Sequence, residues 1–491
     1  MSFQQIGAED VAALIPNGAT VAGDGFTMMG VADEIYLRIE ESFLTTGAPH
    51  DLTFVHAAGQ SNRFDGLARL AHPGLVKRIV GPHWGLNPPM ANMLGADEIE
   101  AICLPQGQIS TLYRTIAAGR PGQLSSVGLG TFVDPRIDGG RINASARAAT
   151  SPTEYVELQE IDGREYLFYK SFPINVGIIR GTRIDPDGNL AQDDDVTILD
   201  ALAIAQAVHN SGGIVIAQVK EIVDRGDIPA RLVNVPGVLI DYVMVVSDPA
   251  KYHRQTNGAL SVNMDLITGY ASAAELAESI LAQEIDPVRQ AIGERGASLV
   301  RDGDIINLGT GLPGDSIGRA LAKSGQIARV TLTVESGTYG GVPLGGVDFG
   351  CALHPAAIIG HPQQFDFYNG GGVDITFMGV GQVDGAGNIN VSAFGGKAVG
   401  CGGFMDIVDG AKRVCFLMVA DSKHPKWVDA VDQLTFYGKA AIDKGQEVYL
   451  ATEHYLVQLT DTGWVILAVD DNDAARRAAA LIKVADSGGH A

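Results

Sequence analysis

The chain has 491 residues, and 46% of them are hydrophobic. It is too long to fold around a single hydrophobic core, so we expect two or three α/β domains. Its 35 basic and 57 acidic residues give a formal net charge of −22. No run of Lys or Arg interrupts this acidity, so we expect neither a nucleic-acid partner nor binding to an anionic membrane surface.

The first ten residues contain neither the basic nor the apolar segment of a secretory signal. The longest apolar stretch, residues 235–246, is interrupted by Asp241 and is too short to span a bilayer. We therefore expect a cytoplasmic, soluble enzyme with no membrane partner. Its four cysteines form no CxxC pair, and its eleven histidines form no HExxH-type ligand set, so we predict reduced thiols and no metal site.

The two halves of the chain repeat one order of elements. In the first half a turn and an apolar run (residues 17–25) precede a helix-like stretch, a strand-like run and a Gly-Asn turn, at residues 31–39, 52–59 and 181–190. The second half repeats this order at residues 302–311, 316–323, 330–337 and 381–389. Strands that alternate with helices predict parallel βαβ units in both halves.

An amphipathic, Ala/Glu-rich stretch at residues 271–290 has no counterpart ahead of the first repeat, and this places the domain boundary near residue 283. We predict an α/β fold of two tandem domains, residues 1–282 and 283–491. Each is expected to contain a mostly parallel sheet flanked by helices.

Three motifs overlap between residues 305 and 341. Gly309, Gly311 and Gly314 form a Gly-x-Gly-x-x-Gly string between a predicted strand and a helix, and Glu335 follows where a ribose-binding acid is expected, ~20 residues on. An NAD-dependent oxidoreductase is therefore one alternative. Against it, the glycines up to Gly341 leave the backbone bare, so that bulky ligand atoms are able to approach the Glu335 carboxylate.

The second motif is the GxSxG string at residues 314–318. Its Ser316 lies several residues beyond the strand, whereas a nucleophile elbow needs the serine at the strand-to-helix turn, so we interpret Ser316 as a residue at a helix start. The third interpretation makes Glu335 a nucleophile. A solvated acid at a strand end is the ordinary alternative, but ligands of open α/β sheets bind at the carboxyl ends of strands. The first repeat has His56 near the equivalent place.

The string Thr333-Val-Glu-Ser-Gly337 resembles the catalytic glutamate motif of the family I CoA-transferases. Further strings along the chain resemble other parts of this family: Leu104-Pro-Gln-Gly107, residues 128–135, Asn307-Leu-Gly-Thr-Gly-Leu-Pro313, residues 377–384 with Gly387-Asn388, and Gly400-Cys-Gly-Gly-Phe-Met-Asp406. The resemblance covers nearly the whole chain and is closest to the single-chain acetate/propionate and 3-ketoacid CoA-transferases, in which an α-type and a β-type domain are fused.

The resemblance implies transfer of CoA between short carboxylic acids through an acyl–glutamyl anhydride and a glutamyl–CoA thioester on Glu335. It implies oxyanion donors from the backbone N–H groups of Gly402 and Gly403 and from Gln106 of the other half. It also implies CoA binding by four residues, Gly309, Gly311, Gly381 and Asn388. The alternatives are a tight turn for the glycine pair, a loop residue for Gln106 and a turn residue for Asn388.

By the same resemblance the partners are acyl-CoA and small carboxylic acids, no cofactor beyond the CoA thioester substrate is needed, and the protein is a homo-oligomer, a dimer or tetramer. An acyl-CoA hydrolase on the same fold and a non-catalytic acyl-CoA sensor are the remaining alternatives. Tyr339 is larger than the residue the family tends to have there. If it narrows or lines the acyl pocket, acetate or propionate as the natural acid is in doubt.

Overall fold

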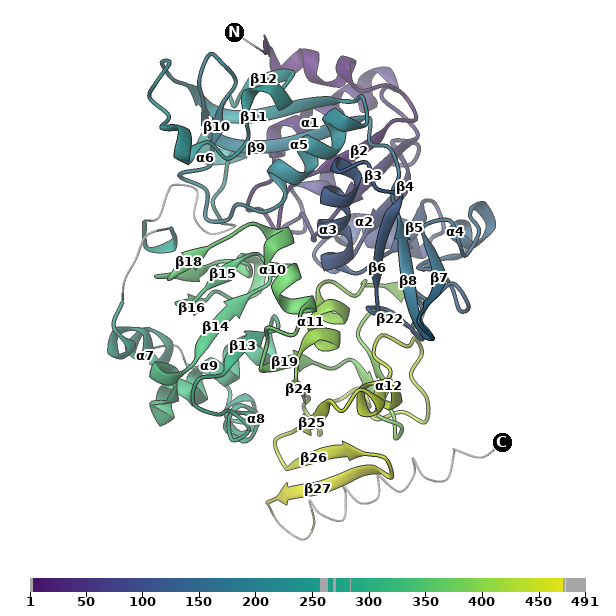
Figure 1. The fold of residues 1–491 in the computed structure, drawn as a ribbon, viewed down its shortest axis with the longest axis vertical. Coiled ribbons are helices and arrows are strands. Elements are labelled where there is room, and N and C mark those ends of the chain that lie inside the picture. Colours follow the sequence, from purple (N-terminus) through teal and green to yellow (C-terminus); the bar gives the residue numbers. More distant parts are fainter. Residues whose placement is uncertain (1–2, 257–263, 268–270, 283, 471–472, 474–491) are drawn as a thin grey trace.

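A computed structural model describes residues 3–256, 264–267, 271–282, 284–470 and 473 (Figure 1). These residues form two halves, each built on a nine-stranded sheet. In Figure 1 the first half lies above the second, and the two meet along a broad junction.

The sheet of the first half has the strand order β1-β12-β11-β9-β2-β3-β4-β5, and β10 pairs with β9. All of its strand pairs are parallel except β9 with β10. Its strands are β1 (Gln4–Ile6), β2 (Thr20–Gly23), β3 (Leu52–His56), β4 (Val76–Gly81), β5 (Glu100–Cys103), β9 (Val176–Ile184), β10 (Leu190–Ala191), β11 (Ile214–Ile222) and β12 (Tyr242–Val245).

Helices connect these parallel strands, as crossover connections require. They are α1 (Asp33–Thr46), α2 (Pro88–Gly95), α3 (Gln106–Ala117), α4 (Ala144–Ala149), α5 (Ala201–Asn210) and α6 (Pro249–Tyr252). A small antiparallel sheet projects from this half and consists of β6 (Gly122–Ser125), β7 (Val156–Ile161) and β8 (Arg164–Lys170). It extends the first half beside the junction (Figure 1).

The sheet of the second half has the order β18-β15-β14-β13-β19-β24-β25-β26-β27. Its five central strands are parallel, and antiparallel strands flank them on both sides. The strands are β13 (Ile305–Leu308), β14 (Thr331–Val334), β15 (Thr338–Tyr339), β18 (Ala357–Ile358), β19 (Ile375–Gly379), β24 (Arg413–Leu417), β25 (Glu447–Ala451), β26 (Tyr455–Thr460) and β27 (Gly463–Val469).

The remaining elements of the second half are short ladders and helices. The ladders are β16 (Val342–Pro343) with β17 (Ala352–Leu353), β20 (Gln382–Val383) with β21 (Ile389–Asn390), and β22 (Ala393–Phe394) with β23 (Lys397–Ala398). The helices are α7 (Ala273–Leu281), α8 (Pro287–Ala297), α9 (Leu312–Ser324), α10 (His361–Asn369), α11 (Phe404–Gly410) and α12 (Gly438–Asp443).

Short 3-10 helices occur in both halves: η1 (Ala8–Leu14), η2 (Leu67–Leu70), η3 (Ala230–Leu232), η4 (Gly237–Leu239), η5 (Met264–Leu266), η6 (Gln326–Arg329) and η7 (Gly346–Asp348).

The internal repeat is visible in the sheet topology. The order β12-β11-β9-β2-β3 of the first half corresponds strand by strand to β25-β24-β19-β13-β14 of the second. The predicted α/β fold with mostly parallel sheets flanked by helices is thereby confirmed. The predicted boundary at residue 283 lies outside the described residues and stays a prediction. Helix α7 precedes it, and its Leu276 and Ile280 pack in the core of the second half.

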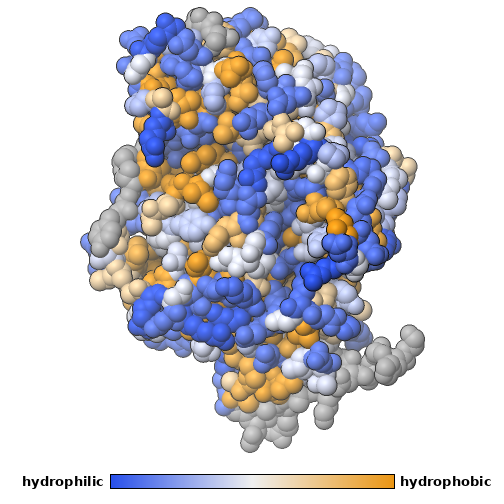
Figure 2. All heavy atoms as spheres, in the orientation of Figure 1, coloured by the Kyte–Doolittle hydropathy of each residue, from blue (hydrophilic) through white to orange (hydrophobic). Residues whose placement is uncertain are grey.

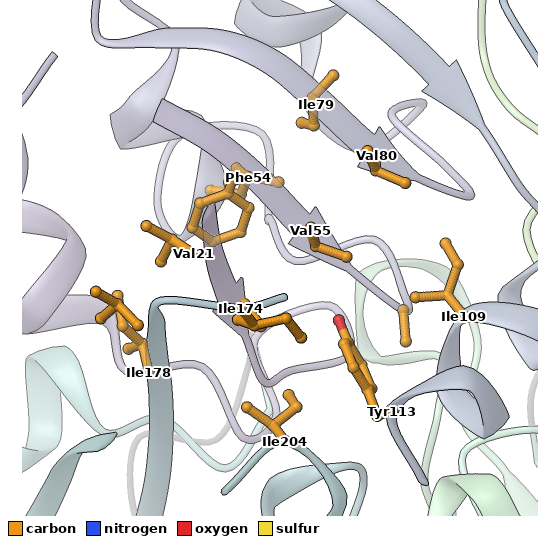
Figure 3. Packing of buried hydrophobic residues seen from close by; sticks show 14 of the residues in the cluster. Val21, Phe54, Val55, Ile79, Val80, Ile109, Tyr113, Ile174, Ile178 and Ile204 are labelled. Carbon is orange, nitrogen blue, oxygen red and sulfur yellow. The ribbon is translucent and has the colours of Figure 1, made fainter. Parts of the chain in front are cut away.

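The core of the first half consists of the apolar runs that form its central strands (Figure 3). Val21, Phe54, Val55 and Ile79 are each at most 1% exposed, because helices cover both faces of a parallel sheet and its strands are then apolar at successive positions. Figure 3 also shows Tyr113 and Ile109 of α3 facing this cluster. Helix α3 is therefore fixed firmly to the sheet, and its first turn reaches the junction.

Hydrophilic and hydrophobic side chains are mixed over the face seen in Figure 2. An apolar group lies at the end formed by β26 and β27, where Val465 and Leu467 are 45% and 49% exposed. Across the described residues, no helix combines the length and the hydropathy needed to cross a membrane.

Candidate active site

Glu335 directly follows β14, at the carboxyl end of the central parallel strands. The chain then turns through Gly337, whose φ of +113° is accessible mainly to glycine, and returns as the antiparallel strand β15. A Cβ at Gly337 would lie 2.0 Å from the carbonyl oxygen of Ile359. The small residue therefore lets residues 357–361 pass close to Glu335.

This packing corrects one interpretation of the sequence. The glycines after Glu335 do not leave the backbone bare for ligand atoms, because protein atoms occupy the space beside them. A Cβ at Gly341 would lie 2.3 Å from the Leu353 oxygen, and one at Gly340 would lie 3.0 Å from Ala356. These glycines allow close packing of the chain on itself, and this packing positions α10.

A cavity of about 460 Å³ lies between the two halves. Five of the residues predicted from the sequence line it: Glu335, Gly309, Gly402 and Gly403 from the second half, and Gln106 from the first. Residues that sequence reasoning did not select complete the wall, among them Phe26, Thr27, Arg63, His83, Phe349 and Met378. The predicted junction site between two domains is therefore a real cavity.

Glu335 is only 8% exposed, and its Oε2 atom has no hydrogen-bond partner among the described residues. Burial raises the pKa of Glu335 from 4.5 to about 7, and its backbone N–H, His361 and Asn307 oppose this shift. A buried carboxylate without a neutralising cation is weakly solvated. Its free oxygen is consequently available to a ligand, in contrast to the solvated acid that was the ordinary alternative.

The glycine pair Gly402-Gly403 forms the turn into helix α11. Gly402 has a φ of +55°, and Gly403 is the N-cap residue of the helix. The N–H of Gly402 donates to the Pro82 oxygen at 2.8 Å and is therefore not free, which corrects its prediction as an oxyanion donor. Within the described ranges no acceptor is recorded for the N–H of Gly403. It remains a free donor at a helix N-terminus, where negative charge is favoured.

Gln106 begins helix α3 and reaches across the junction. Its backbone N–H donates to the Gly402 oxygen at 3.1 Å, and the Cβ that Gly403 lacks would lie 3.7 Å from the Gln106 amide carbon. Its side-chain Nε2 lies 3.0 Å from Nε2 of His361, and Nδ1 of His361 lies 2.7 Å from Oδ2 of Asp200. Gln106 is 3% exposed and is not a surface loop residue.

Polar contacts continue along the first turn of α3. The Gly107 N–H and the Gln108 side-chain amide both donate to Asp406 of the second half, each at 2.8 Å. Asp406 is fully buried, and burial raises its pKa to about 7. Cys103 and Cys401 also meet here, with their sulfur atoms 3.8 Å apart. The two halves therefore dock through specific buried contacts beside the cavity.

Three of the predicted CoA-binding residues do not line the cavity. Gly311 caps the N-terminus of α9, and a Cβ at Gly381 would lie 2.2 Å from the ring of Phe394. Asn388 donates to Asp384 at 3.0 Å and accepts from the Gly438 N–H at 3.2 Å, as a turn residue does. Their roles in CoA binding stay predictions, whereas Gly309 faces the cavity.

The structure also decides two further expectations, on Ser316 and Tyr339. Ser316 lies inside α9, is 1% exposed and donates to the Leu312 oxygen, so it is a helix residue as interpreted and not a nucleophile. Tyr339 does not line the cavity, and its ring packs against Phe367 at 5.9 Å between centroids. The concern that Tyr339 narrows the acyl pocket is therefore not supported.

His361 and Asp200 were missed because nothing local in the sequence marks them. His361 precedes a proline at a helix start and Asp200 precedes α5, and both look like ordinary helix-terminal residues. The positive φ angles of Thr27 and Arg63, +52° and +92°, also cannot be recognised from sequence. The hydroxyl of Thr27 is buried and has no partner in the described part of the chain, and Thr27 lines the cavity.

One group of three potential metal ligands occurs in the described residues, Asp421, Glu453 and His454. None of the three lines the cavity. Both carboxylate oxygens of Glu453 already accept backbone N–H groups, from Ala420 and Asp421. The group therefore gives no role to a metal at the candidate site.

Comparison with known proteins agrees with this geometry. Residues 6–246 match the family described as Coenzyme A transferase. The caffeate CoA-transferase of Acetobacterium woodii is 36% identical over 94% of this chain and 91% of its own length. The acetate CoA-transferase YdiF of Escherichia coli O157:H7 is 32% identical over 94% of this chain and 88% of its own length.

Two crystal structures of the acyl-CoA transferase YdiF from E. coli O157:H7 have the same fold. The apoenzyme is 31% identical and a thioester complex with CoA is 30% identical, and each aligns with a TM-score of 0.84 over 95% of this chain and 90% of that one. The fold is therefore that of an acyl-CoA transferase. The chain belongs to the coenzyme A transferase family and is a CoA-transferase.

Proposed function

We propose that this protein transfers CoA between short-chain carboxylic acids by a ping-pong mechanism in which Glu335 is the covalent nucleophile. The observation that carries the proposal is the buried Oε2 atom of Glu335, which has no hydrogen-bond partner among the described residues and belongs to a side chain that lines a cavity between the two halves. The name of one relative, an acetate CoA-transferase, and the thioester complex of CoA with a structural relative support this class of substrate.

The first half-reaction begins with attack of a Glu335 carboxylate oxygen on the carbonyl carbon of the acyl-CoA. The carbon–sulfur bond breaks, CoA leaves as a thiolate, and an acyl–glutamyl anhydride remains. The thiolate then attacks the glutamyl carbonyl carbon, the bond to the acyl carboxylate breaks, and a glutamyl–CoA thioester and the first acid result. A second carboxylate enters and reverses these steps, so that each half-reaction is balanced.

Each tetrahedral intermediate carries an oxyanion that needs donors. The free N–H of Gly403 and the side-chain amide of Gln106 line the same cavity and are our candidates, one from each half. Losing one such donor typically costs ~10²–10³ in rate. Because one donor comes from each half, the docked arrangement is needed for the reaction.

Burial of Glu335 has two consequences for the proposed chemistry. Weak solvation makes the carboxylate more reactive but raises its pKa to about 7, so only the ionised fraction attacks. The closed position between the halves also limits access of water, to which both covalent intermediates are sensitive. The carboxylate performs the transfer itself, so the proposed reaction needs no metal or redox cofactor. Assembly into a homo-oligomer remains part of the proposal.

The experiment is to incubate the protein with acetyl-CoA alone, reduce it with borohydride, and map the modified peptide by mass spectrometry. We expect a reduced adduct at Glu335, release of one acetate per site, and no adduct in Glu335→Gln. Adding propionate or caffeate as acceptor should discharge the adduct to the corresponding acyl-CoA.

A hydrolase on the same fold would lose the thioester equally fast with and without an acceptor acid. A protein that binds acetyl-CoA without forming any adduct would be a sensor. Either result would overturn the proposed transfer reaction.

A further inference from the structure

A chain of buried hydrogen bonds connects Gln106 to the opposite side of the junction. His361 is 0% exposed, and its two ring nitrogens contact Asp200 at 2.7 Å and Gln106 at 3.0 Å. The other Asp200 oxygen accepts the Ser110 hydroxyl at 2.5 Å. Gln106 and Asp200 belong to the first half, and His361 belongs to the second. The His361 imidazole therefore bridges two residues of the opposite half.

The chemistry of these groups fixes the positions of the protons when His361 is neutral. A carboxylate only accepts hydrogen bonds, so the Nδ1 atom that faces Asp200 carries the imidazole proton. The Nε2 atom then has a lone pair and accepts from Gln106. Only the NH₂ end of the Gln106 amide satisfies this contact, and the amide oxygen does not. Asp200 thereby determines which way the Gln106 amide is turned.

Other contacts hold the imidazole in this place. The backbone N–H of His361 donates to the Leu199 oxygen at 3.2 Å. The ring of His361 packs edge-on against Phe365 at 5.1 Å and against Phe26 at 6.1 Å between centroids. Asp200 itself is held by its backbone N–H, which donates to Asp24 at 3.0 Å. Contacts from both halves therefore hold the imidazole and Asp200 in place.

We infer that His361 and Asp200 are positioning residues that orient the Gln106 side-chain amide toward the reacting carbonyl oxygen. One N–H of the amide is donated to His361, and no acceptor within the described part of the chain is recorded for the other. Gln106 lines the cavity together with Glu335 and Gly403, so its second N–H is available to an oxyanion. This inference rests on the proposed function, because an oxyanion forms only if the thioester is attacked.

The opposite orientation would displace this donor from its present position. If the histidine carried its proton on Nε2, the amide would turn its oxygen toward the ring and its NH₂ group away, as the wrong tautomer does in a Ser-His-Asp triad. Asp200→Asn supplies an amide donor to Nδ1 and therefore favours that tautomer. His361→Phe keeps a flat ring between Phe26 and Phe365 but removes the acceptor. Both variants should leave acyl-CoA affinity nearly unchanged and act on the chemical step.

The test is a double-mutant cycle on the single-turnover rate of glutamyl–CoA formation from acetyl-CoA. We expect Gln106→Leu, His361→Phe and Asp200→Asn each to lower this rate by about 10–10³-fold, with KM changed by less than about threefold. In the Gln106→Leu background the other two substitutions should cost no more than about threefold further, since residues that act through one group are not additive. His253→Phe, which removes a buried histidine of the first half, is the control and should stay near the wild-type rate.

The outcomes separate the two claims. If wild-type protein forms no adduct at Glu335, the proposed function fails. If it forms the adduct but the losses in the double variants multiply, His361 and Asp200 act independently of Gln106 and the inference is overturned. Melting temperatures of all variants, with rates expressed per folded molecule, exclude a loss that merely reflects unfolding.

Discussion

The two halves share one order of strands but have different residues at the carboxyl ends of corresponding strands. Strand β3 ends at His56, and the corresponding strand β14 is followed by Glu335. His56 is sealed inside the first half: its Nδ1 contacts the Ala58 oxygen at 2.7 Å, its ring packs near Trp84, and burial lowers its pKa to about 4. Glu335 instead opens onto the cavity. The same sheet position is structural in one half and available for chemistry in the other.

The turns before α5 and α11 show the same kind of divergence. Leu199 and Gly402 have nearly the same φ, +52° and +55°, and each accepts a backbone N–H from the opposite half, from His361 and Gln106 respectively. The next residue is Asp200 in the first half, where its carboxylate contacts His361. In the second half it is Gly403, whose N–H has no acceptor among the residues that the structure describes. The two sides of the junction are thus related by an approximate twofold symmetry. The candidate site uses the turn of the second half, at Gly402 and Gly403, and the corresponding turn of the first half holds His361.

A third pair of positions has not diverged. Asn189 donates to Asp185 at 3.0 Å and accepts the Gly237 N–H at 3.3 Å, and Asn388 makes the same two contacts with Asp384 and Gly438. The comparison therefore separates residues that build the frame from residues that have been altered for function. Substitutions at paired positions test this separation directly.

The largest difference is expected for the pair Glu335 and His56. Glu335→Gln removes the nucleophile and should lower kcat by ~10⁴-fold or more. His56→Gln changes a sealed position and should keep the specific activity of the folded fraction within about threefold, although its stability falls. Steady-state kinetics with acetyl-CoA and an acceptor acid, together with thermal melts, measure both. Comparable losses of activity in the two variants would contradict the assignment.

The pH dependence of the first half-reaction is the next largest effect. With the pKa of Glu335 at about 7, the ionised fraction falls tenfold per pH unit below that value, and the rate at pH 5 should be ~10²-fold below its plateau. His56, with a pKa of about 4, is neutral throughout this range and should add no inflection. Stopped-flow measurement of acetate release between pH 5 and 8.5 provides the profile. A flat profile would show that Glu335 is not limiting.

Gly402 is expected to matter for catalysis more than for folding. Leu199 shows that this frame accepts a side chain at nearly the same φ, so Gly402→Ala should cost only ~1–2 kcal/mol of stability. The new methyl would lie about 3.9 Å from the Gln106 amide oxygen and intrude on the cavity, so we expect a ~10–10²-fold loss of kcat/KM. Chemical denaturation and kinetics on the same preparation separate the effects. A stability loss that accounts for all lost activity would argue otherwise.

Removing the charge of Glu335 should stabilise the protein at high pH. The folded-state pKa, about 7, lies above the unfolded value of 4.5, so the folded state binds more protons and stability falls as pH rises between these values. Glu335→Gln lacks this penalty and should gain about 3 kcal/mol over wild type at pH 8, but little at pH 4.5. Unfolding by urea at the two pH values measures the difference. An equal effect at both would contradict burial of the acid.

The smallest contrast is expected where the halves are alike. Asn189→Ala and Asn388→Ala should each cost ~1–3 kcal/mol, because each removes the side-chain donor to one aspartate oxygen, of Asp185 or Asp384, and the acceptor of one backbone N–H, of Gly237 or Gly438. Both should leave KM for acyl-CoA within about threefold. A rise in KM confined to the Asn388 variant would instead support the CoA-binding role that the sequence predicts.

The sequence is sufficient to predict the α/β class and the repeat, because apolar periodicity and glycine turns indicate them, and a local motif identifies Glu335 as the candidate nucleophile. It does not predict the contacts of Gln106. His361 lies 255 residues from Gln106 and 161 residues from Asp200, and no local pattern links them. The hydrogen bond from the Gly402 N–H to the Pro82 oxygen likewise depends on tertiary packing, so the sequence does not predict it. Motifs identify the reacting groups, and only the docked halves show which donors are free.

The buried carboxylate of Asp406 has a consequence for how the halves recognise each other. Its two oxygens accept hydrogen bonds from the first turn of α3, at Gly107 and Gln108, and a hydrogen bond from Asn369 of the second half also lowers its pKa. A slipped or rotated docking would remove both donors of α3, and a buried acid that loses its partners costs several kcal/mol. Such a contact adds little attraction but strongly disfavours every wrong alignment. The docking of the two halves therefore sets the geometry of the candidate site before a substrate binds.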